Sequence, residues 1–510
     1  MTPLRLCELL ASMSCAGDAG MGLPDEAGVR GAVIASALAA EVGASDEERA
    51  DAYWLPLLRY AGCTADAHLN AAVMEDEVAV HRDMYGIDYG EPGELLPFVV
   101  RRVGRDKPLP ARVLAVLGAF ARMPSLLDTG RAHCEVGDRL ATRFGLGQST
   151  RDALFRIFER WNGKGLPRGL RGDAIALAAR IANVAQEAEI GHRLDGADGA
   201  AALVKRRAGK MLDPRLAEAF ARRAAALCEP LDRPSVWPAF LAAEPGGPRM
   251  VDDAALDEGL RAMGDFADLQ SRWLRGHSAG VAALARGAGE RHGLSAKDAT
   301  LLERAALVHD VGRVSVSAGV WDAPRPLRDR EWERVRLHTY VTECVLSRAS
   351  SLAPLAEVAA LAHERLDGRG YHRRLPPVAI PPVARLLAAC DVYHALIEDR
   401  PHRAALDATR AAETLRSEAK AGRLDGEAVE AVLGAAGHRA HARTPRPGSL
   451  SDREVEVIRL LARGLTNKEI AAKLGISVKT AGHHVQHVFE KAGVTTRAAA
   501  AMYAMQYALV

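Results

Sequence analysis

A long-range internal repeat is the feature of this sequence that most limits how the chain can fold. The stretch ERWNGKGLP at 159–167 matches ERLDGRGYH at 364–372, at an offset of 364 − 159 = 205 residues. His133 and His338 are separated by the same 338 − 133 = 205 residues. A repeat with so long a period predicts tandem domains and argues against a solenoid of short units.

The two copies differ in length upstream of these matches. GASDEERAD, which begins at Gly43, resembles GLSAKDATL, which begins at Gly293, at an offset of 293 − 43 = 250 residues. The first copy therefore contains 250 − 205 = 45 additional residues, which we place within 66–112. In both stretches a serine precedes an acid by three residues, as is typical of a helix N-terminus. Richness in Ala, Leu, Arg and Glu also favours helices, so the sequence predicts an all-α fold.

Two stretches rich in Pro suggest where the domains end. They are AEPGGPR at 243–249 and HARTPRPGS at 441–449, and such compositions suit linkers better than helix interiors. A chain of 510 residues has room for about three domains. We therefore predict two tandem helical domains, a basic linker and a small C-terminal domain, at 1–242, 250–437, 438–448 and 449–510 respectively.

Composition excludes several classes of protein. Charge nearly balances, at 67 − 65 = +2, so any binding of nucleic acid must be local. The seven cysteines form no CxxC pair, which indicates reduced thiols rather than a disulfide framework or a zinc site. No apolar run approaches the ~18 residues of a membrane helix, and Glu8 makes the N-terminus a poor signal peptide. We expect a cytoplasmic protein with no membrane partner.

The middle segment contains a dispersed set of candidate metal ligands. Imidazoles and carboxylates together suit divalent ions that polarise phosphate oxygens and acidify water. The adjacent pair of His309 and Asp310 could reach one ion, and the carboxylate could bridge to a second. The alternative is a retained scaffold whose histidines only satisfy buried hydrogen bonds. The six candidates are His277, His309, Asp310, His338, His363 and Asp391.

The residues around these candidates resemble a known family. ALVHDVGR, HTYVTECVL, HERLDGRGY, ARLLAACDVYHAL and EDRPHRAAL occur in the order seen in HD-domain phosphohydrolases of the HD-GYP type, over about 271–433. The resemblance implies a helical bundle with one or two divalent ions (Fe, Mn or Mg) that hydrolyses cyclic di-GMP or a related cyclic dinucleotide or phosphate ester. It also implies roles for particular residues: His277, His309, Asp310 and Asp391 for a first ion, His338 and His363 for a second, Asp310 and Arg313 for catalysis, and Asp367, Gly368, Gly370 and Tyr371 for the loop that names the family.

Three positions depart from the family pattern. Ala362 stands where a His is usual, which removes one ligand, and His372 replaces the final Pro of the loop. Arg313 replaces a Lys and exchanges a compact ammonium for a broad fork. Two alternatives remain open nearby: Glu364 either orients His363 or is a surface acid, and Arg400 and Arg403 contact either phosphate or neighbouring acids.

The same positions in the first copy hold different residues. The offsets place Arg59 and Tyr60 opposite the His309–Asp310 pair, Ala27 opposite His277, Phe158 opposite His363, and Gln186 opposite Asp391. Only His133 keeps a ligand type. An apolar ring, an amide and a cation cannot replace those ligands, so we predict a degenerate copy without a metal centre. It could pack on the second copy, form a dimer or sense a ligand.

The last segment has the pattern of a DNA-binding domain. Residues 449–510 carry eight Lys and Arg against five Asp and Glu, giving 8 − 5 = +3. Ser451 and Thr466 each precede a Glu by three residues, Gly475 can make a tight turn, and Ser477 can cap a further helix. This order predicts a helix-turn-helix whose second helix lies in the major groove.

The segment LSDREVEVIRLLARGLTNKEIAAKLGISVKTAGHHVQHVFEKAGVTTRAAA closely resembles the LuxR-type domain of bacterial transcription regulators. The resemblance implies four helices, recognition by the third helix and dimerisation through the last, at 496–508. It places Gly482, His483 and Gln486 at base edges and Lys468, Lys479, Thr480 and Arg497 at phosphates. The alternative is that these polar residues only form a solvated helix face.

Together these features predict a homodimeric transcriptional regulator that binds double-stranded DNA. Its middle domain is either a phosphodiesterase or a non-catalytic HD domain that gates DNA binding. A non-catalytic domain would either sense a nucleotide or be merely structural. Because a fold does not establish an activity, the sequence alone leaves both possibilities open.

Overall fold

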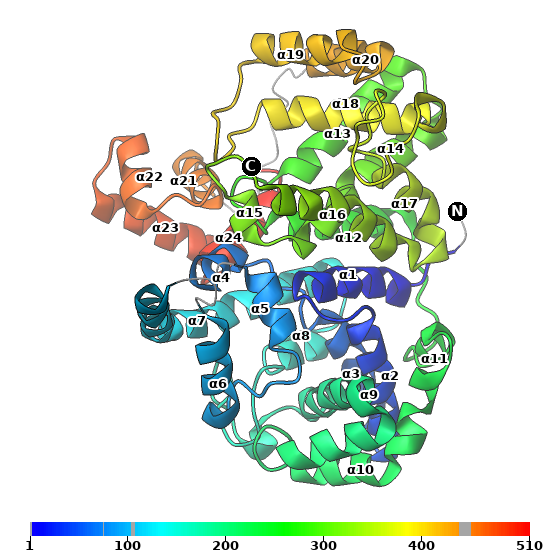
Figure 1. Cartoon of the computed structure of the whole chain (residues 1–510), viewed down its shortest axis with the longest axis vertical. Coiled ribbons are helices and arrows are strands. Elements are labelled where there is room, and N and C mark those ends of the chain that lie inside the picture. The colour runs from blue at the N-terminus through cyan, green and yellow to red at the C-terminus, as the bar shows by residue number, and fades with distance from the viewer. Residues whose placement is uncertain (1–2, 75, 104–107, 438–449) are drawn as a thin grey trace. The chain divides into compact units, whose positions relative to one another are not determined.

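The computed structural model describes residues 3–74, 76–103, 108–437 and 450–510 (Figure 1). Within these ranges the regular structure is helical and no β-strand occurs, which confirms the predicted all-α class. None of the described helices combines the length and hydrophobicity needed to cross a bilayer. The chain divides into two compact units, Pro3–Val251 and Asp252–Val510. The linker predicted at 438–448 lies outside the described residues.

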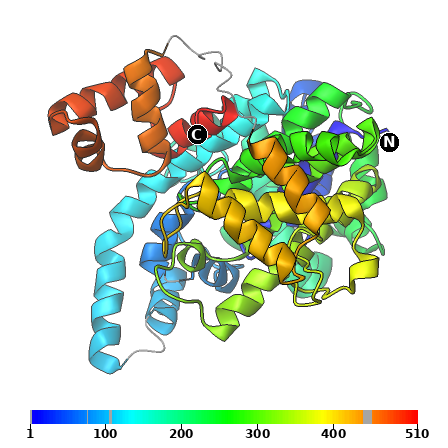
Figure 2. The same ribbon diagram turned by 90° about the horizontal axis from the view of Figure 1, so that it is seen from above.

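The unit Pro3–Val251 contains the first eleven α-helices. The longest, α7, is the extended cyan helix of Figure 2. The described residues of 66–112, where we placed the additional residues, include α4, α5, α6 and the start of α7. The helices are α1 (Leu6–Gly20), α2 (Ala27–Glu41), α3 (Asp46–Leu58), α4 (Ala67–Met74), α5 (Glu77–Asp83), α6 (Pro92–Arg102), α7 (Leu109–Arg143), α8 (Gln148–Leu154), α9 (Leu177–Arg207), α10 (Pro214–Cys228) and α11 (Trp237–Ala242).

The core of this unit forms where α2, α3 and α9 pack against one another. Ser45 and Glu48 form the capping box that begins α3, as the sequence predicted. Tyr53, fully buried on α3, stacks on Phe240 with ring centroids 5.3 Å apart.

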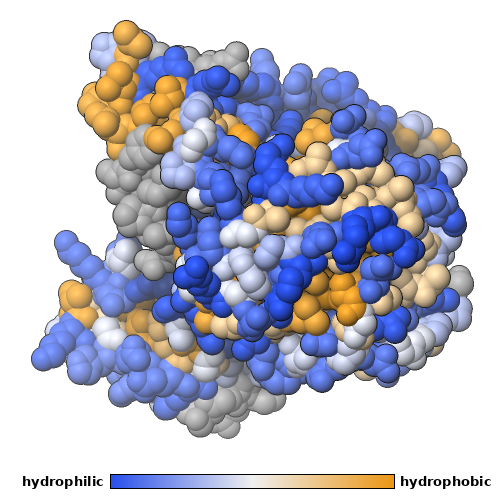
Figure 3. Space-filling view, turned by 90° about the horizontal axis from the view of Figure 1, so that it is seen from below, coloured by the Kyte–Doolittle hydropathy of each residue, from blue (hydrophilic) through white to orange (hydrophobic). Residues whose placement is uncertain are grey.

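One face of the molecule is covered mainly by hydrophilic side chains with smaller apolar patches between them (Figure 3).

The unit Asp252–Val510 begins with a bundle in which α13 packs against α14, α18 and α20. Ser295 caps α14, as predicted. A 3₁₀ turn, Val311–Ser315, follows α14 and packs against α16. The bundle helices are α12 (Asp253–Asp268), α13 (His277–His292), α14 (Ala296–Val308), α15 (Ala318–Trp321), α16 (Asp329–Ser347), α17 (Ala353–Ala359), α18 (Pro382–Leu396), α19 (Ala408–Lys420) and α20 (Gly426–Ala436).

The last four helices form as the capping signals predicted. Ser451 and Thr466 close capping boxes at the starts of two helices, and Ser477 caps a third. Gly475 ends one of them with φ of +63°, a conformation that favours glycine. The helices are α21 (Asp452–Ala462), α22 (Asn467–Leu474), α23 (Val478–Ala492) and α24 (Arg497–Gln506). The turn between α22 and α23 gives the helix-turn-helix order.

Candidate metal centre and DNA-binding face

The six predicted ligands come from separate elements and meet in one buried cluster. His277 is the first residue of α13, directly after Gly276, whose φ is +85°. His309 and Asp310 directly follow the last residue of α14, where the chain turns into the 3₁₀ segment. The others are His338 on α16, His363 after α17 and Asp391 on α18, and each of the six is at most 5% exposed.

Asp310 lies at the middle of this cluster. Its Oδ1 is 2.9 Å from His338 Nε2 and 3.0 Å from His363 Nε2. Its Oδ2 is 2.9 Å from His309 Nε2 and 2.5 Å from Arg313 Nη2. One carboxylate therefore reaches imidazoles on both of its sides, as a ligand that bridges two ions must.

Asp391 joins the remaining imidazoles. Its Oδ1 is 3.2 Å from His277 Nε2, and its Oδ2 is 3.2 Å from His363 Nδ1. The other nitrogen of His277 lies 2.8 Å from Glu398 Oε2. A carboxylate on the far nitrogen is a common way to orient a metal-ligating histidine.

Backbone carbonyls orient two further imidazoles. The Nδ1 of His309 donates to the carbonyl of Ala306, and the Nδ1 of His338 donates to that of Val335. With Nδ1 engaged in this way, the Nε2 of each ring faces Asp310. The backbone of α14 and α16 thus selects which ring nitrogen is presented to the centre.

The charges of the cluster shift its pKa values strongly. Burial acts to raise the pKa of Asp310, but Arg313 and the neighbouring imidazoles hold it well below its usual range. Burial acts to lower the pKa of His309, but the carboxylates of Asp310 and Asp391 raise it to about 10. For His338 burial prevails and lowers the pKa to about 4. The carboxylates are therefore ionised at neutral pH, as metal ligands must be.

The cluster fits a centre for one or two divalent ions. In one group His277, His309, Asp310 and Asp391 bring ligand atoms within 4.8 Å of one another. In a second group Asp310, His338 and His363 do the same, so Asp310 belongs to both. This is the division that the family resemblance implied. Nitrogen and carboxylate oxygen donors of this kind suit Fe or Mn better than Ca.

Arg313 is a buried cation at the edge of the centre. Beyond its contact with Asp310, its guanidinium lies 5.3 Å from the centroid of the Trp321 ring. Its Nε and Nη1 are buried and have no hydrogen-bond partner in the described part of the chain. These two unused N–H groups beside the centre are suited to donating hydrogen bonds to phosphate oxygens.

The loop of the family motif contacts the centre at one end. Tyr371 stacks on His363 with ring centroids 4.7 Å apart. Gly370 is required by space, because a Cβ there would lie 2.6 Å from the Cα of Glu364. Asp367 and Gly368 instead form the outer turn, where the φ of Gly368 is +71° and Asp367 is exposed. They shape the loop and do not reach the ligands.

Three side chains that the sequence left open have structural contacts. Glu364 is neither a surface acid nor a partner of His363: it is 3% exposed and accepts backbone N–H groups of Arg373, Arg374 and Leu375. Arg400 pairs with Glu398 at 2.6 Å. Arg403 donates to backbone carbonyls at the end of α18, among them that of Leu396. The Nη2 of Arg400 also lies 3.5 Å from His277 Nδ1, so Arg400 borders the centre, whereas the contacts of Arg403 are with backbone carbonyls.

Sequence reasoning missed Glu398 and His394. Glu398 lies 2.8 Å from His277 and 3.1 Å from His394, and these three form a further group able to hold a metal. A signal was present: Asp391, His394 and Glu398 follow the i, i+3, i+7 spacing of one helical face, continued just past the end of α18.

The corresponding positions of the other unit hold no such cluster. Among the described residues of Pro3–Val251, no group of His, Cys, Asp and Glu lies close enough to hold a metal. The Nε2 of His133 donates to the carbonyl of Arg59, 2.7 Å away, and the ring contacts Phe158 edge to face. Burial lowers the pKa of His133 to about 4, as expected of a structural histidine.

The predicted base contacts lie on one exposed side of α23. His483 and Gln486 are exposed, Gly482 is half-buried, and Gln486 donates to Glu490 at 3.1 Å. Residues three and four apart share a helix face, so these positions form a single row. The opposite side of α23, with Val485 and Val488, is buried in the domain core.

The side chains predicted to contact phosphates differ in their exposure and in the hydrogen bonds that they already make within the domain. Lys468 and Lys479 are exposed, whereas the hydroxyl of Thr480 lies 2.7 Å from that of its cap, Ser477. Arg497 donates to the carbonyl of Leu465 and the side chain of Asn467, so it ties α24 to the start of α22.

The last helix is already covered in the single chain. Every residue of α24 from 498 to 505 is buried. A dimer formed through this helix would need one of its faces to become exposed. Dimerisation through 496–508 therefore stays a prediction.

Comparison with known proteins agrees with this geometry. Residues 261–428 match the profile of the HD domain, and residues 448–504 match that of bacterial regulatory proteins of the luxR family. The chain combines an HD domain with a luxR-family DNA-binding domain. The HD-domain match contains all six candidate ligands, and the luxR-family match spans α21 to α23 and most of α24.

Relatives of the HD domain are cyclic-dinucleotide phosphodiesterases. The chain is 27% identical to 3′3′-cGAMP-specific phosphodiesterase 3 of Vibrio cholerae over 413 residues, which cover 80% of this chain and 89% of the relative. It is 34% identical to the cyclic di-GMP phosphodiesterase response regulator of Xanthomonas campestris, over 31% of this chain and 40% of the relative. It is 30% identical to a cyclic di-GMP phosphodiesterase of Thermotoga maritima, over 28% of this chain and 39% of the relative. For these last two, the chain spans about two fifths of the relative's length.

A solved structure shares the fold over most of the chain. The crystal structure of a cyclic GMP-AMP specific phosphodiesterase in V. cholerae superimposes with a TM-score of 0.59 at 24% identity. The match covers 86% of this chain and 98% of the other. It extends well beyond the HD-domain segment.

Proposed function

We propose that the HD domain is a metal-dependent phosphodiesterase that hydrolyses cyclic di-GMP or a related cyclic dinucleotide such as 3′3′-cGAMP. The observation that carries this proposal is the position of Asp310, whose two oxygens face ligand atoms of both metal-binding groups. The relatives act on phosphodiesters of this class. Hydrolysis adds one water across a P–O bond and leaves a phosphomonoester and a free hydroxyl.

The side chains of the centre have separate tasks in this proposal. Bound divalent ions supply Lewis acidity, which polarises the phosphate and makes water a better nucleophile. Arg313 donates its two unused N–H groups to the phosphate and offsets the negative charge that grows in the transition state. Tyr371 holds the ring of His363 in place by stacking on it, and its own side chain borders the centre.

Turnover by the full chain tests this function. Protein loaded with Fe, Mn or Mg is incubated with cyclic di-GMP and with 3′3′-cGAMP, and the products are separated by chromatography. We expect a linear dinucleotide or mononucleotides from the wild type and none from Asp310→Ala. Asp298→Ala, which changes a half-buried carboxylate of α14 that accepts from Ser295, away from the cluster, is the matched control and keeps activity. No product with any of the three ions would refute the proposal for these substrates.

A second candidate function is favoured by one residue. Ala362 is fully buried at the position where the family has a further His, so the centre lacks one ligand. A centre with fewer ligands could bind a cyclic dinucleotide without cleaving it and so regulate DNA binding. In that case the nucleotide changes the affinity for DNA and is recovered intact, which the same chromatography measures.

For the C-terminal domain we propose that α23 reads DNA. His483 and Gln486 contact base edges, because both are exposed on one helix face and both carry suitable donors or acceptors. Lys468 and Lys479 contact phosphates, since each is an exposed cation near the ends of α22 and α23. The proposed output of the chain is control of transcription.

We also propose that the two units are copies of one fold. Asp18 accepts a hydrogen bond from the backbone N–H of Gly28 at 3.1 Å. Asp268 and Ser278, which lie 250 residues after Asp18 and Gly28, form the same contact at 2.8 Å. Glu159 accepts from the backbone of residues 168 and 170, and Glu364 from that of residues 373 and 375, at an offset of 205. Equivalent hydrogen bonds at equivalent positions support duplication more strongly than sequence similarity alone does.

A further inference from the structure

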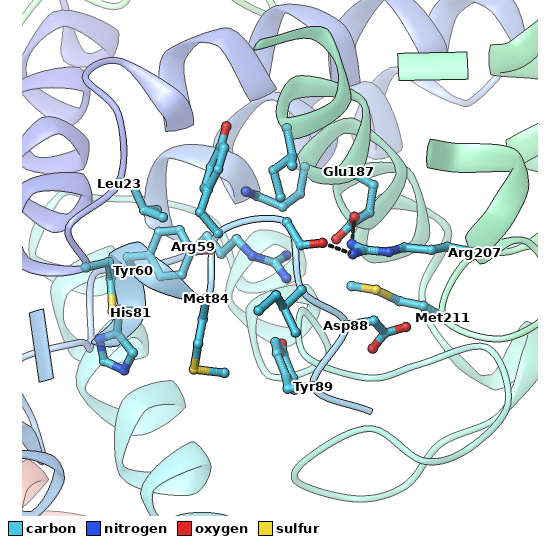
Figure 4. A pocket seen from close by; sticks show the side chains of 16 residues that line it. Leu23, Arg59, Tyr60, His81, Met84, Asp88, Tyr89, Glu187, Arg207 and Met211 are labelled. Atoms are coloured by element: carbon cyan, nitrogen blue, oxygen red, sulfur yellow. Dashed lines mark hydrogen bonds and ion pairs between the residues drawn. The ribbon is translucent and has the colours of Figure 1, made fainter. Parts of the chain in front are cut away.

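A cavity of about 110 Å³ lies within the unit Pro3–Val251 (Figure 4). Its walls come from the end of α3, the chain following α5, the middle of α9 and the segment after α9. Three tyrosines and three methionines give it a mainly aromatic and apolar lining: Tyr60, Tyr85, Tyr89, Met21, Met84 and Met211.

Arg59 supplies a cation to this cavity. Its side chain reaches into the middle of the lining residues, between Tyr60 and the Glu187–Arg207 pair (Figure 4). Arg59 is 3% exposed, and its Nη1 donates to Asn183 Oδ1 at 2.9 Å. Its Nε has no hydrogen-bond partner, and no carboxylate among the described residues lies within ion-pair distance of its guanidinium.

The other charges around the cavity cancel one another. Glu187 forms an ion pair with Arg207. Asp88 accepts two hydrogen bonds from Arg160, at 2.7 and 2.8 Å. His81 is the remaining titratable nitrogen base of the lining, and burial lowers its pKa to about 4, so it is neutral at pH 7. Arg59 is therefore the one charged side chain of this lining that has no ion-pair partner among the described residues.

A buried cation without a counter-charge destabilises a fold. The faces of Phe158 and Tyr60 lie 5.1 and 5.9 Å from the guanidinium and provide partial compensation, but neither ring carries a negative charge. An anion in the cavity would supply the missing charge. The tyrosine rings and the polarisable methionines would then contact a flat apolar body attached to it.

We propose that this cavity binds a small organic anion, consisting of one carboxylate or phosphate group on a flat aromatic body. The anionic group lies against Arg59, and the body lies between the tyrosines and methionines. The volume of about 110 Å³ is below the about 150 Å³ of a closed cavity that accepts benzene, so a ring with its anionic group would fill the cavity and reach its mouth. Tyr89 is 52% exposed and marks the mouth, through which a larger ligand can extend.

Arg59 and Gln186 stand at positions that correspond to candidate metal ligands of the other unit. Under the duplication proposed above, Arg59 corresponds to His309 and Gln186 to Asp391, and both residues of the first unit line the cavity. A fixed cation then stands where the second unit gathers its metal ligands. The anion site itself rests on the cavity and on Arg59, and not on the duplication.

Binding of simple probes to the full chain tests the site. Phenyl phosphate and benzoate carry both the charge and the ring, inorganic phosphate carries the charge alone, and benzyl alcohol carries the ring alone. We expect the first two to bind at least tenfold more tightly than the last two in calorimetric titrations. All titrations use Asp310→Ala protein treated with a chelator, so that the HD-domain centre does not contribute phosphate binding.

Variants then assign the binding to the cavity. Arg59→Gln should weaken binding of phenyl phosphate at least tenfold, and Tyr89→Ala, at the exposed mouth, at least threefold. Arg233→Gln is the matched control, because Arg233 is an exposed arginine of the same unit that pairs with Glu229, and it should bind as before. Arg59→Gln removes an uncompensated buried charge, so without ligand it should melt at the same temperature or higher.

Two outcomes would overturn the proposal. One is equal binding of phenyl phosphate by the parent protein and the Arg59→Gln variant. The other is benzyl alcohol binding as tightly as phenyl phosphate, which would make the cavity an apolar one in which Arg59 has no part. If Arg59→Gln fails to fold, Tyr89→Ala decides, and unchanged binding there refutes the site. None of these results depends on whether the HD domain is catalytic.

Discussion

Glu398 shows how one side chain outside the ligand set can control the centre. Its Oε2 lies 2.8 Å from His277 Nδ1, so it fixes the ring that presents Nε2 to Asp391. We expect Glu398→Gln to weaken metal binding by tenfold or more, as is typical when such an orienting carboxylate is lost. Metal titration with a competing chelator measures this.

The matched control is Glu430→Gln, which changes an exposed carboxylate of α20 that pairs with Arg416. It should leave metal affinity unchanged. If Glu398→Gln also binds metal as the wild type does, Glu398 serves only to neutralise Arg400.

The pKa of His309 predicts how metal binding depends on pH. Without a bound ion its pKa is about 10, because the carboxylates of Asp310 and Asp391 more than offset the effect of burial. A metal ligand must be neutral, so at pH 7 an incoming ion displaces about one proton from this ring. Apparent affinity should therefore rise as pH increases from 7 towards 10. Calorimetry in buffers of different ionisation enthalpy counts the released proton.

The same pKa has a consequence for the stability of the metal-free protein. The folded-state pKa of His309 lies above its ordinary value of 6.5, so the charged ring stabilises the fold fully below about pH 6.5. That contribution is lost as pH rises through about 10. Chelator-treated protein that melted at a higher temperature at pH 10 than at pH 7 would contradict this assignment.

At the scale of elements, the close approach of the 3₁₀ turn to α16 sets the distance between Asp310 and His338. Gly312 makes that approach possible, because a Cβ there would lie 2.1 Å from the carbonyl oxygen of His338. We expect Gly312→Ala to lower the free energy of unfolding by about 1–3 kcal/mol or more, as overpacking does. Urea unfolding of the full chain measures the loss.

Gly426→Ala is the control for this substitution. Gly426 begins α20 and a Cβ there would meet no atom within 4 Å, so its effect should stay within about 1 kcal/mol. Equal effects of the two substitutions would show that the turn can move away from α16.

Local signals were the part of the fold that sequence predicted best. Ser295, Ser451 and Thr466 cap helices where expected, since a cap depends on three or four adjacent residues. The six candidate ligands could also be selected from the sequence, because the selection needs only residue type and order. The contact of Glu398 with His277 joins residues 121 apart, and the cavity around Arg59 depends on packing, so neither could be predicted before the helices were assembled.

At the scale of the whole molecule, a nearly neutral chain contains a positively charged DNA-binding domain. The full chain carries +2 and the last domain +3, so attraction to DNA is local. Binding should weaken steeply with salt, with a slope set by the number of phosphate contacts. We expect Lys479→Gln to reduce the magnitude of that slope by about one, whereas Gln486→Ala should keep the slope and lose sequence preference.

Fluorescence anisotropy with a duplex selected from a random library, at several salt concentrations, measures both quantities. Lys297→Gln, which changes an exposed lysine of α14, is the control and should leave the slope as it is. If Lys479→Gln loses sequence preference while its slope is unchanged, the proposed division between α23 contacts is wrong.

The separation of the ligands along the chain has a further consequence. His277 and Asp391 are 114 residues apart, and the other candidate ligands fall between them, at the end of α14, on α16 and after α17. Ions held by these residues would act as cross-links that the unfolded chain cannot keep without closing several long loops. Loading the centre should therefore make the HD domain unfold more cooperatively and resist proteolysis, even in a variant that no longer hydrolyses any nucleotide.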